Sequence, residues 1–450
     1  MHPFLNSLRK MFYLVSPMEL ALDEKDEMPQ FLLKDGIPMF ILFIGLEFIF
    51  HRIIVEKRKK NFIKQKKINE SSNNQDWLNF DFGKLGDKIY YRFKELFTSI
   101  GIGATEQILN FSFDVLGLVS TIMVYSFFYN NFRINTIDVK SYPITSFVSL
   151  FIIKDFIYYW THRCLHEYHI LWAAHMVHHS GEDYNLGTGL RQGALQNIMS
   201  IPFVIPVAIL GFPPQAYSGH SQLNTMYQFS VHTDTIERLW FGLEYILNSP
   251  SAHRMHHRPP GNCNYGGVLI IWDRLFGTYC PETKRKDYYG LAKQPNTFDP
   301  IKLNFIHYEV IQRIKNKTLF SKILTRRVKW KWICSYKNLF DPIPKIKEDL
   351  RPQGPLRSKW NGHMPTKGIN YLLKTTINIS LLFSIIVTLM IGKRLSNENV
   401  ILLVSSEILA VSFMARSWDN YPKLGDVYTA LTFLLLDIIL YILFSQPITK

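Results

Sequence analysis

Apolar residues in this chain gather in long uncharged runs rather than at the periodic spacing of a soluble domain. The longest run extends from Gln192 to Thr233, 42 residues without any Asp, Glu, Lys or Arg. Its middle carries Gly-Phe-Pro-Pro at 211–214, a sequence typical of a turn. Because a membrane-spanning helix needs about 20 apolar residues, the run predicts two helices joined by a turn, which we interpret as a membrane hairpin.

Further apolar stretches predict additional membrane spans. Several of them carry a single acidic residue, such as Glu47 or Asp437, and a charge within lipid is costly unless it is paired or functional. The predicted fold is therefore all-α, a polytopic integral membrane helical bundle. Its spans besides the hairpin are 37–50, 107–129, 144–160, 375–391, 400–415 and 427–444.

The formal net charge of +15 does not indicate a nucleic-acid partner. Eight Lys and Arg residues lie between Arg52 and Lys67, directly after the first predicted span, and the stretch from Lys284 to Lys367 is also basic. Neither stretch resembles a nucleic-acid-reading motif, whereas basic loops beside spans mark the cytoplasmic side of a membrane and attract anionic lipid. We expect both chain termini outside and the hairpin to enter from the cytosolic side.

The amino-terminal residues and the cysteines predict no processing or disulfide framework. Residues 1–34 contain acidic clusters and no apolar core, unlike a cleavable signal peptide. The four cysteines form no Cys-x-x-Cys pair and lie in segments expected in the cytosol. Neither a disulfide scaffold nor a zinc ribbon is expected.

Histidines provide the candidate chemistry. Eleven of the fifteen fall between His162 and His257, and histidine is the commonest metal ligand. Residues three or four positions apart share one face of a helix, so each of three spaced groups can present its rings to a common point. The groups, called boxes below, are His162-x3-His166, His175-x2-His178-His179 and His253-x2-His256-His257.

The hairpin returns the third box to the side of the first two, because it enters and leaves the membrane on the same face. Eight nitrogen ligands exceed the four of a structural zinc site, so the sequence predicts two metal ions. Imidazole suits iron, zinc, copper and nickel, which leaves the metal open at this point. The predicted metal ligands are His162, His166, His175, His178, His179, His253, His256 and His257.

Carboxylates near the boxes are candidates for supporting roles, since ligating histidines usually donate their second N–H to a carboxylate or a carbonyl. Glu167, directly after His166, is the candidate catalytic residue. A solvated or helix-capping role explains the other candidates equally well: Glu182, Asp183, Asp155 and Asp234. The roles of His169, His220 and His232 remain open, with His232 either an additional ligand or part of the cavity wall.

At the boxes the chain resembles the fatty acid hydroxylase and sterol desaturase superfamily, whose signature is His-x3-His, His-x2-His-His and His-x2-His-His. All eight positions match. Within the superfamily the chain is most similar to the alkylglycerol monooxygenase family. That similarity rests on Glu-Asp-Tyr-Asn-Leu at 182–186, Leu-Arg-Gln at 190–192, Leu-Asn-Ser-Pro-Ser at 247–251, Gly-Val-Leu-Ile-Ile-Trp-Asp at 267–273 and Phe-Gly-Thr at 276–278.

The resemblance implies two iron ions, O2 as a co-substrate and tetrahydrobiopterin as the electron donor. It implies hydroxylation of the ether-linked carbon of a membrane alkylglycerol lipid, which then falls apart into a fatty aldehyde and a glycerol derivative. The enzyme would lie in the endoplasmic reticulum membrane with its site facing the cytosol. The protein's part in such chemistry is to position lipid and metal and to exclude side reactions.

Two other functions use the same residues. A sterol or sphingolipid hydroxylase or desaturase fed by cytochrome b5 would carry the same boxes. A non-catalytic membrane metal-binding protein would carry histidines at several depths of its spans, unlike the clustering seen here. The expected organisation is an amino-terminal segment at 1–35, spans with a basic loop at 36–143, a catalytic domain at 144–280, a basic cytosolic segment at 281–368 and carboxy-terminal spans at 369–450.

Overall fold

In the computed structural model, the described part of the chain is built from helices joined by turns and loops. The structure describes residues 2–51, 53, 93–115, 121–259, 261–283, 289–313, 318, 326, 327, 405, 409, 412 and 415. Within these residues the β-pairing consists of two isolated bridges, Tyr168 with Arg326 and Leu247 with Leu269. The all-α prediction is confirmed for this part of the chain.

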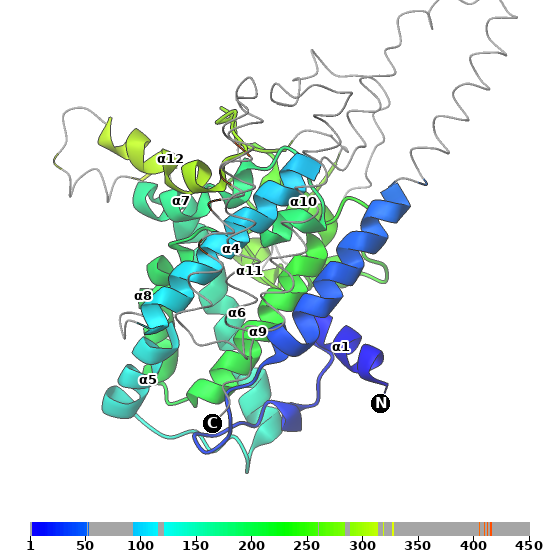
Figure 1. The fold of residues 1–450 in the computed structure, drawn as a ribbon. Helices are drawn as coiled ribbons and strands as arrows, with labels where there is room; N and C mark the ends of the chain where they lie inside the picture. Colours follow the sequence, from blue (N-terminus) through cyan, green and yellow to red (C-terminus); the bar gives the residue numbers. More distant parts are fainter. Residues whose placement is uncertain are drawn as a thin grey trace, which may run out of the picture.

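Five long helices form the body of the molecule (Figure 1). Helix α6 packs against α8 and α9, and α5 packs against the same two helices. Their shared core includes Tyr125, Leu150, Val207 and Tyr217. The five helices are α4 (Phe93–Val115), α5 (Thr121–Phe132), α6 (Pro143–Glu167), α8 (Gln196–Ile209) and α9 (Pro214–Val231).

Several of the short helices lie at one end of this body, the upper end in Figure 1. Helix α7 (His169–His175) packs against α6, α8 and α12 (Pro300–Gln312). Helix α10 (Pro250–His257) begins with proline and is capped by the Ser249 hydroxyl, which accepts from the backbone N–H of Ala252. The other short elements are η4 (His178–Ser180), η5 (Leu186–Leu190), η6 (Leu243–Tyr245) and α11 (Ile271–Leu275).

The amino-terminal elements pack on α6 and α9. They comprise α1 (Pro3–Met11), η1 (Pro17–Glu19), the π-helical turn η2 (Leu32–Gly36) and helical residues 37–51. Phe40 stacks on Phe229 with ring centroids 3.8 Å apart. A buried ion pair between Lys10 and Asp35, 2.6 Å long, ties α1 to η2.

The predicted helix–turn–helix is present as α8 and α9 with a turn at residues 210–213. Gly211 has φ +92, and a Cβ there would come within 1.8 Å of the Asn135 carbonyl oxygen, so the turn requires glycine. The backbone N–H of Ile137 donates to the Gly211 carbonyl, which holds the turn against the loop after α5. Because the turn lies at the end of the body opposite α7 and α10, both limbs reach toward those short helices (Figure 1).

Some of the predicted spans coincide with helices of the structure and others do not. Among the described helices, none has both the length and the apolarity needed to cross a bilayer. Residues 37–50 and 144–160 are helical, whereas 107–129 is divided between α4 and α5, with 116–120 outside the described residues. The closing stretches 375–391, 400–415 and 427–444 lie outside the described residues, apart from four positions of the second.

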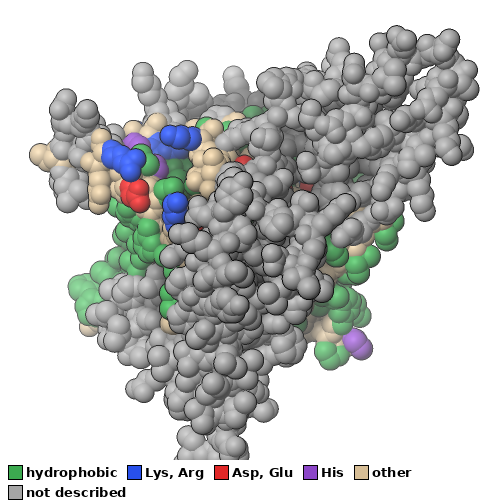
Figure 2. Space-filling model, turned by 45° about the horizontal axis from the view of Figure 1, so that its top comes forward, with side chains coloured by type: hydrophobic (Ala, Val, Ile, Leu, Met, Phe, Trp, Pro, Cys, Tyr) green, Lys and Arg blue, Asp and Glu red, His purple; other side chains and the backbone are tan. Residues whose placement is uncertain are grey.

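Apolar side chains cover much of the described surface (Figure 2). Many of the exposed apolar residues come from three helical stretches that are distant in the sequence, and others lie in α1 and at residues 236–246. In the three stretches the exposed residues are Ile41, Leu42, Leu46, Ile49, Phe50 and Ile53 in the amino-terminal helix, Met123, Phe127 and Phe132 in α5, and Ile144, Val148 and Ile152 in α6.

Candidate metal centre

The eight box histidines lie together at the end of the body that carries the short helices. Helix α6 contributes the first box near its end, α7 and η4 contribute the second, and α10 contributes the third. A ninth ring, His232, joins them from the residue that caps α9. All nine are at most 4% exposed.

The nine rings form two groups with ligand geometry. Within each group, one nitrogen from each ring lies within 4.8 Å of every other. The five-histidine group contains His162, His166, His175, His179 and His256, and the four-histidine group contains His178, His232, His253 and His257.

The prediction that each box can bring two or three rings to one point holds for two rings of every box: His162 with His166, His175 with His179, and His253 with His257. His178 and His179 belong to different groups, as do His256 and His257. Adjacent residues of an α-helix point about 100° apart, so neighbouring rings of α10 point in different directions. The second and third boxes therefore each serve both groups.

Distances between ring nitrogens match coordination to a common ion. The His175 Nε2 lies 3.1 Å from that of His162 and 3.2 Å from that of His179. In the second group, the His232 Nε2 lies 3.2 Å from that of His178 and 2.9 Å from that of His253. Metal–nitrogen bonds of about 2.0–2.1 Å place two nitrogens on one ion roughly 3.0–3.4 Å apart.

The two groups adjoin each other. The rings of His179 and His257, one from each group, stack with centroids 4.3 Å apart. The rings of His175 and His178, again one from each group, lie 5.1 Å apart between centroids. Two ions held by these groups would therefore be neighbours within one centre.

Backbone carbonyls orient four of the nine rings. The Nδ1–H of His162 donates to the Tyr265 carbonyl (2.9 Å), that of His178 to the Arg191 carbonyl (2.9 Å) and that of His256 to the Cys263 carbonyl (2.8 Å). His232 donates to the Gln228 carbonyl, and His175 to the Gln196 side chain. This fixes the tautomer, so that Nε2 keeps its lone pair for the centre of the group.

Some buried ring nitrogens have no hydrogen-bond partner within the described residues. They are both nitrogens of His166, Nε2 of His256 and Nδ1 of His253. Leaving a buried polar atom unsatisfied costs about 1–3 kcal/mol. A metal in the five-histidine group would satisfy one nitrogen of His166 and the Nε2 of His256, so the residues present fit a bound ion.

Burial keeps the box histidines neutral. Desolvation lowers the pKa of His175 to about 4 and that of His256 to about 3. Desolvation, followed by repulsion from neighbouring rings, also lowers the pKa of His166 and His179 well below the usual value. Neutral imidazole is the form that binds metals, so the site is prepared for binding at neutral pH.

Sequence comparison places the boxes in a known family. The family model for fatty acid hydroxylase matches residues 147–278, which include every box. The alkylglycerol monooxygenase of Xenopus tropicalis is 32% identical over 440 residues, 96% of this chain and 87% of that protein. The chain belongs to the alkylglycerol monooxygenase family. This confirms the resemblance drawn from the boxes.

Other relatives match shorter regions. The alkylglycerol monooxygenase of Homo sapiens is 38% identical over 302 residues, 66% of this chain and 59% of that protein. The ornithine lipid hydroxylase OlsE of Rhizobium tropici is 33% identical over 133 residues, 28% of this chain and 40% of that protein. No solved structure matches.

In this family member, Glu167 lies buried at the end of α6 and faces arginines. Its Oε1 accepts from Arg163 Nε at 2.9 Å, and its Oε2 lies 3.5 Å from Arg326. It belongs to neither histidine group. A catalytic role for Glu167 stays a prediction.

Asp155 binds the chain segment that follows Tyr265, whose carbonyl orients His162. Its carboxylate accepts from the backbone N–H groups of Val268 (2.8 Å) and Leu269 (3.0 Å) and from the Trp272 indole (3.0 Å). These bonds hold the segment after Tyr265 against α6. Since the Tyr265 carbonyl binds His162, Asp155 contributes to the position of a candidate ligand without touching it.

The other candidate carboxylates lie near the centre but outside both histidine groups. Asp234 lies 3.8 Å from Arg254, and its Oδ1 accepts from the Tyr289 hydroxyl at 3.4 Å. Glu182 and Asp183 are buried just after η4. The ring N–H groups donate to backbone carbonyls and to one side-chain amide. These acceptors take the place of the carboxylates that the sequence suggested.

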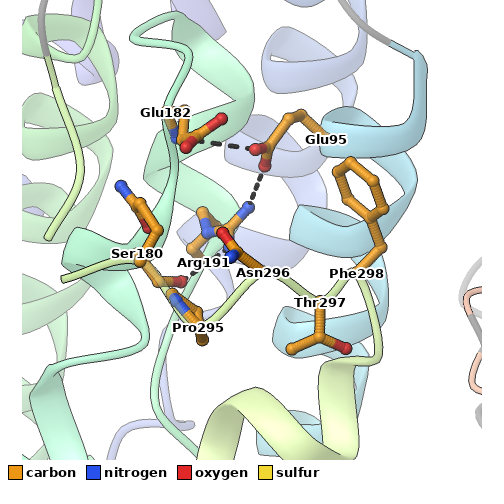
Figure 3. A pocket seen from close by; sticks show the side chains of 9 residues that line it. Glu95, Ser180, Glu182, Arg191, Pro295, Asn296, Thr297 and Phe298 are labelled. Atoms are coloured by element: carbon orange, nitrogen blue, oxygen red, sulfur yellow. Dashed lines mark hydrogen bonds and ion pairs between the residues drawn. The ribbon is translucent and has the colours of Figure 1, made fainter. Parts of the chain in front are cut away.

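Sequence reasoning did not identify Arg191 as a site residue. Its carbonyl accepts from His178, while its buried guanidinium pairs with Glu95 of α4 at 2.7 Å and donates to the Ser180 hydroxyl at 2.7 Å (Figure 3). These residues line a cleft together with Glu182 and residues 294–298. The sequence did contain a sign that could have singled out Arg191, because it is the last charged residue before the uncharged run.

The three open histidines have different surroundings. His232 is a member of the four-histidine group. His220 lies 2.5 Å from the Tyr13 hydroxyl through its Nδ1, and His169 stacks on His307 of α12 with centroids 5.6 Å apart. Neither His169 nor His220 belongs to a histidine group.

Proposed function

We propose that the chain is a di-iron alkylglycerol monooxygenase. It would hydroxylate the ether-linked carbon of alkylglycerol lipids with O2 and tetrahydrobiopterin. The observation that carries the proposal is the pair of adjoining buried histidine groups in a chain whose relatives are named alkylglycerol monooxygenases. The name of those relatives supports the substrate class.

The proposed metal ligands are the eight box histidines together with His232. Five would hold one iron and four the other, following the two groups. Bound iron would activate O2, with the pterin as the source of two electrons. Iron is preferred here because of the family, since imidazole alone suits several metals.

The atoms of the reaction balance as a mono-oxygenation. One oxygen atom of O2 enters the C–H bond beside the ether oxygen, and the other leaves as water with two electrons and two protons. The product is a hemiacetal. Breaking its carbon–oxygen bond to the glycerol gives the fatty aldehyde and a free hydroxyl on the glycerol derivative.

The chain's own residues hold and shield this chemistry. Carbonyls of Tyr265, Arg191 and Cys263 orient the rings, as described above. Trp172 lies 5.0 Å from the His166 ring and Tyr184 lies 5.3 Å from the His257 ring, between centroids. Such aromatic walls around a buried centre exclude water and limit side reactions.

We include Glu167 in the proposal as a residue of the site. Its ion pair with Arg163 lies on the same helix as His162 and His166, which supports a positioning role for the first box. Replacing it with Gln should lower turnover. Rescue by Asp at neutral pH would support a need for the charge itself.

We further propose that the enzyme is embedded in the endoplasmic reticulum membrane with its centre at the cytosolic face. Exposed apolar side chains on residues 37–53, α5 and α6 support contact with lipid, because soluble proteins rarely expose large contiguous apolar surfaces. The domain division given above is part of this proposal. The lipid tail would stay in the bilayer while the water-soluble pterin enters from the cytosol.

Aldehyde release from an alkylglycerol tests the proposal. Membranes containing the chain should release aldehyde only with tetrahydrobiopterin, and His178→Ala should abolish the release. A second assay supplies the same membranes with a cytochrome b5 system and sterol or sphingolipid substrates. If iron-replete protein forms product in the second assay and releases no aldehyde in the first, the ether-lipid assignment is overturned.

A further inference from the structure

A buried charge cluster holds the third histidine box. Arg254 lies between His253 and His256 in the sequence, and Arg258 directly follows the box. Both guanidinium groups bind Glu282: Arg254 Nη2 at 2.8 Å from Oε2, and Arg258 Nη2 at 2.5 Å from Oε1. The side chains of Arg254 and Glu282 are 0% exposed and that of Arg258 is 7% exposed. One carboxylate therefore joins two arginines of the box.

Arg254 also reaches the element that carries the ninth histidine. It donates to the carbonyls of Ile236 (2.7 Å), Glu237 (2.7 Å) and Thr233 (3.2 Å). This segment directly follows His232. Arg254 thus bridges the end of α9 and helix α10, the two elements that supply three rings of the four-histidine group.

Among the described residues, the two arginines of the cluster face two acids. These acids are Glu282 and Asp234, and Asp234 lies 3.8 Å from Arg254 with its side chain 30% exposed. Removing a partner from a buried ion pair leaves an uncompensated charge, which is much more costly than the same loss at a surface. Without Glu282, the acid that remains near Arg254 among the described residues is Asp234, which is more distant and more exposed.

We propose that Glu282 is a positioning residue for the four-histidine group. It fixes Arg254 and Arg258, so that α10 keeps His253 at ligand distance from His232, where their Nε2 atoms are 2.9 Å apart. This rests on the proposed metal-dependent function. The five-histidine group takes only His256 from α10, so Glu282 matters mainly for one of the two metal sites.

Metal titration of the full-length protein tests this inference. Anaerobic Fe(II) loading of Glu282→Gln, followed by metal analysis and Mössbauer spectroscopy, gives the affinity and environment of each site. Loss of an outer partner typically lowers metal affinity by about 10–100-fold. We expect that loss at one site only, and the weakened signal should be the one that His232→Ala removes.

Asp35→Asn is the matched control. It also converts a buried, ion-paired carboxylate to an amide, in the Lys10–Asp35 pair, and Asp35 belongs to neither histidine group. Both ions should bind it with wild-type affinity even if its melting temperature falls. If Glu282→Gln lowers the metal affinity of both sites equally, the variant has destabilised the whole centre and the proposal is overturned.

Arg258→Gln provides a milder variant in case Glu282→Gln does not fold. It removes one arm of the cluster and leaves the Arg254–Glu282 pair. The same site should weaken, by a smaller factor. Wild-type affinity at both sites in Glu282→Gln, or in Arg258→Gln if that is the folded variant, would overturn the proposal.

The titration is independent of the ether-lipid assignment. A wild-type protein that binds two ions and releases no aldehyde would contradict the proposed substrate and leave the role of Glu282 intact. A Glu282→Gln protein with two tight ions and normal aldehyde release would contradict only the role of Glu282.

Discussion

The five-histidine group takes all its members from the three boxes, whereas the four-histidine group depends on His232, which lies outside them. The first group includes both rings of the His162-x3-His166 pair on one uninterrupted helix. The second is assembled from η4, the end of α9 and α10. Both groups need tertiary packing, but the first contains two pairs spaced four residues apart, whereas the second contains one such pair and needs the end of α9.

Loss of a ring from the five-histidine group should have the largest effect. His166→Ala removes a buried ring with no hydrogen-bond partner among the described residues, so metal binding is the interaction most at stake. Loss of a residue that hydrogen-bonds to a metal ligand lowers metal affinity by up to roughly 100-fold, and loss of the ligand itself should lower it further. Aldehyde release should disappear. Metal analysis and activity in parallel measure both effects.

The control for His166 is His169→Ala, three residues further along the chain. Its ring stacks on His307 outside both groups. It should keep two ions. Equal metal loss in both variants would indicate that the region unfolds rather than that His166 binds metal.

Removal of His232 tests whether the second group needs its ninth ring. His232→Ala leaves three histidines in that group, so one of the two ions should bind at least 10-fold more weakly. The matched variant is His220→Ala on the same helix, whose ring contacts Tyr13 instead. Two ions bound with unchanged affinity in His232→Ala would show that His232 only lines the cavity.

Arg191→Lys should have a smaller effect on the same group. Lysine keeps the charge but cannot pair with Glu95 and Ser180 through a planar fork as arginine does. The backbone carbonyl that orients His178 would shift, and we expect about 10-fold weaker binding at one site. Arg9→Lys, which alters the Arg9–Glu19 pair, should leave both affinities unchanged.

Tyr13→Phe should produce the smallest change. It removes the hydroxyl that contacts His220, and a hydrogen bond of this kind contributes about 0.5–1.5 kcal/mol to stability. The free energy of unfolding should fall by that amount while both ions remain. A loss of metal in this variant would mean that the far part of α9 controls the centre.

The sequence predicted the features that depend on local spacing. The run from Gln192 to Thr233 indicated two helices with a turn, and the structure has α8 and α9 around Gly211. The His162-x3-His166 pair indicated two rings on one helical face, and both rings are in one group. These patterns involve neighbours on the same element, so no tertiary information is needed.

Features that arise between elements could not be read in the same way. Helical spacing separates adjacent rings of the second and third boxes, but it does not contain the second cluster that His178 and His256 each join, because that cluster is completed by other elements. The pairing of Arg254 with Glu282 joins residues 28 positions apart, and that of Arg191 with Glu95 joins residues 96 apart. Such pairings depend on how the elements pack.

The metal content of the purified, full-length protein tests the central claim most directly. Two histidine groups predict two metal ions per chain. With iron, the metal of the proposed function, they predict two distinct Mössbauer environments corresponding to five and four nitrogen donors. A single ion per chain under iron-replete conditions, or two ions that His232→Ala and His166→Ala both leave in place, would contradict the account.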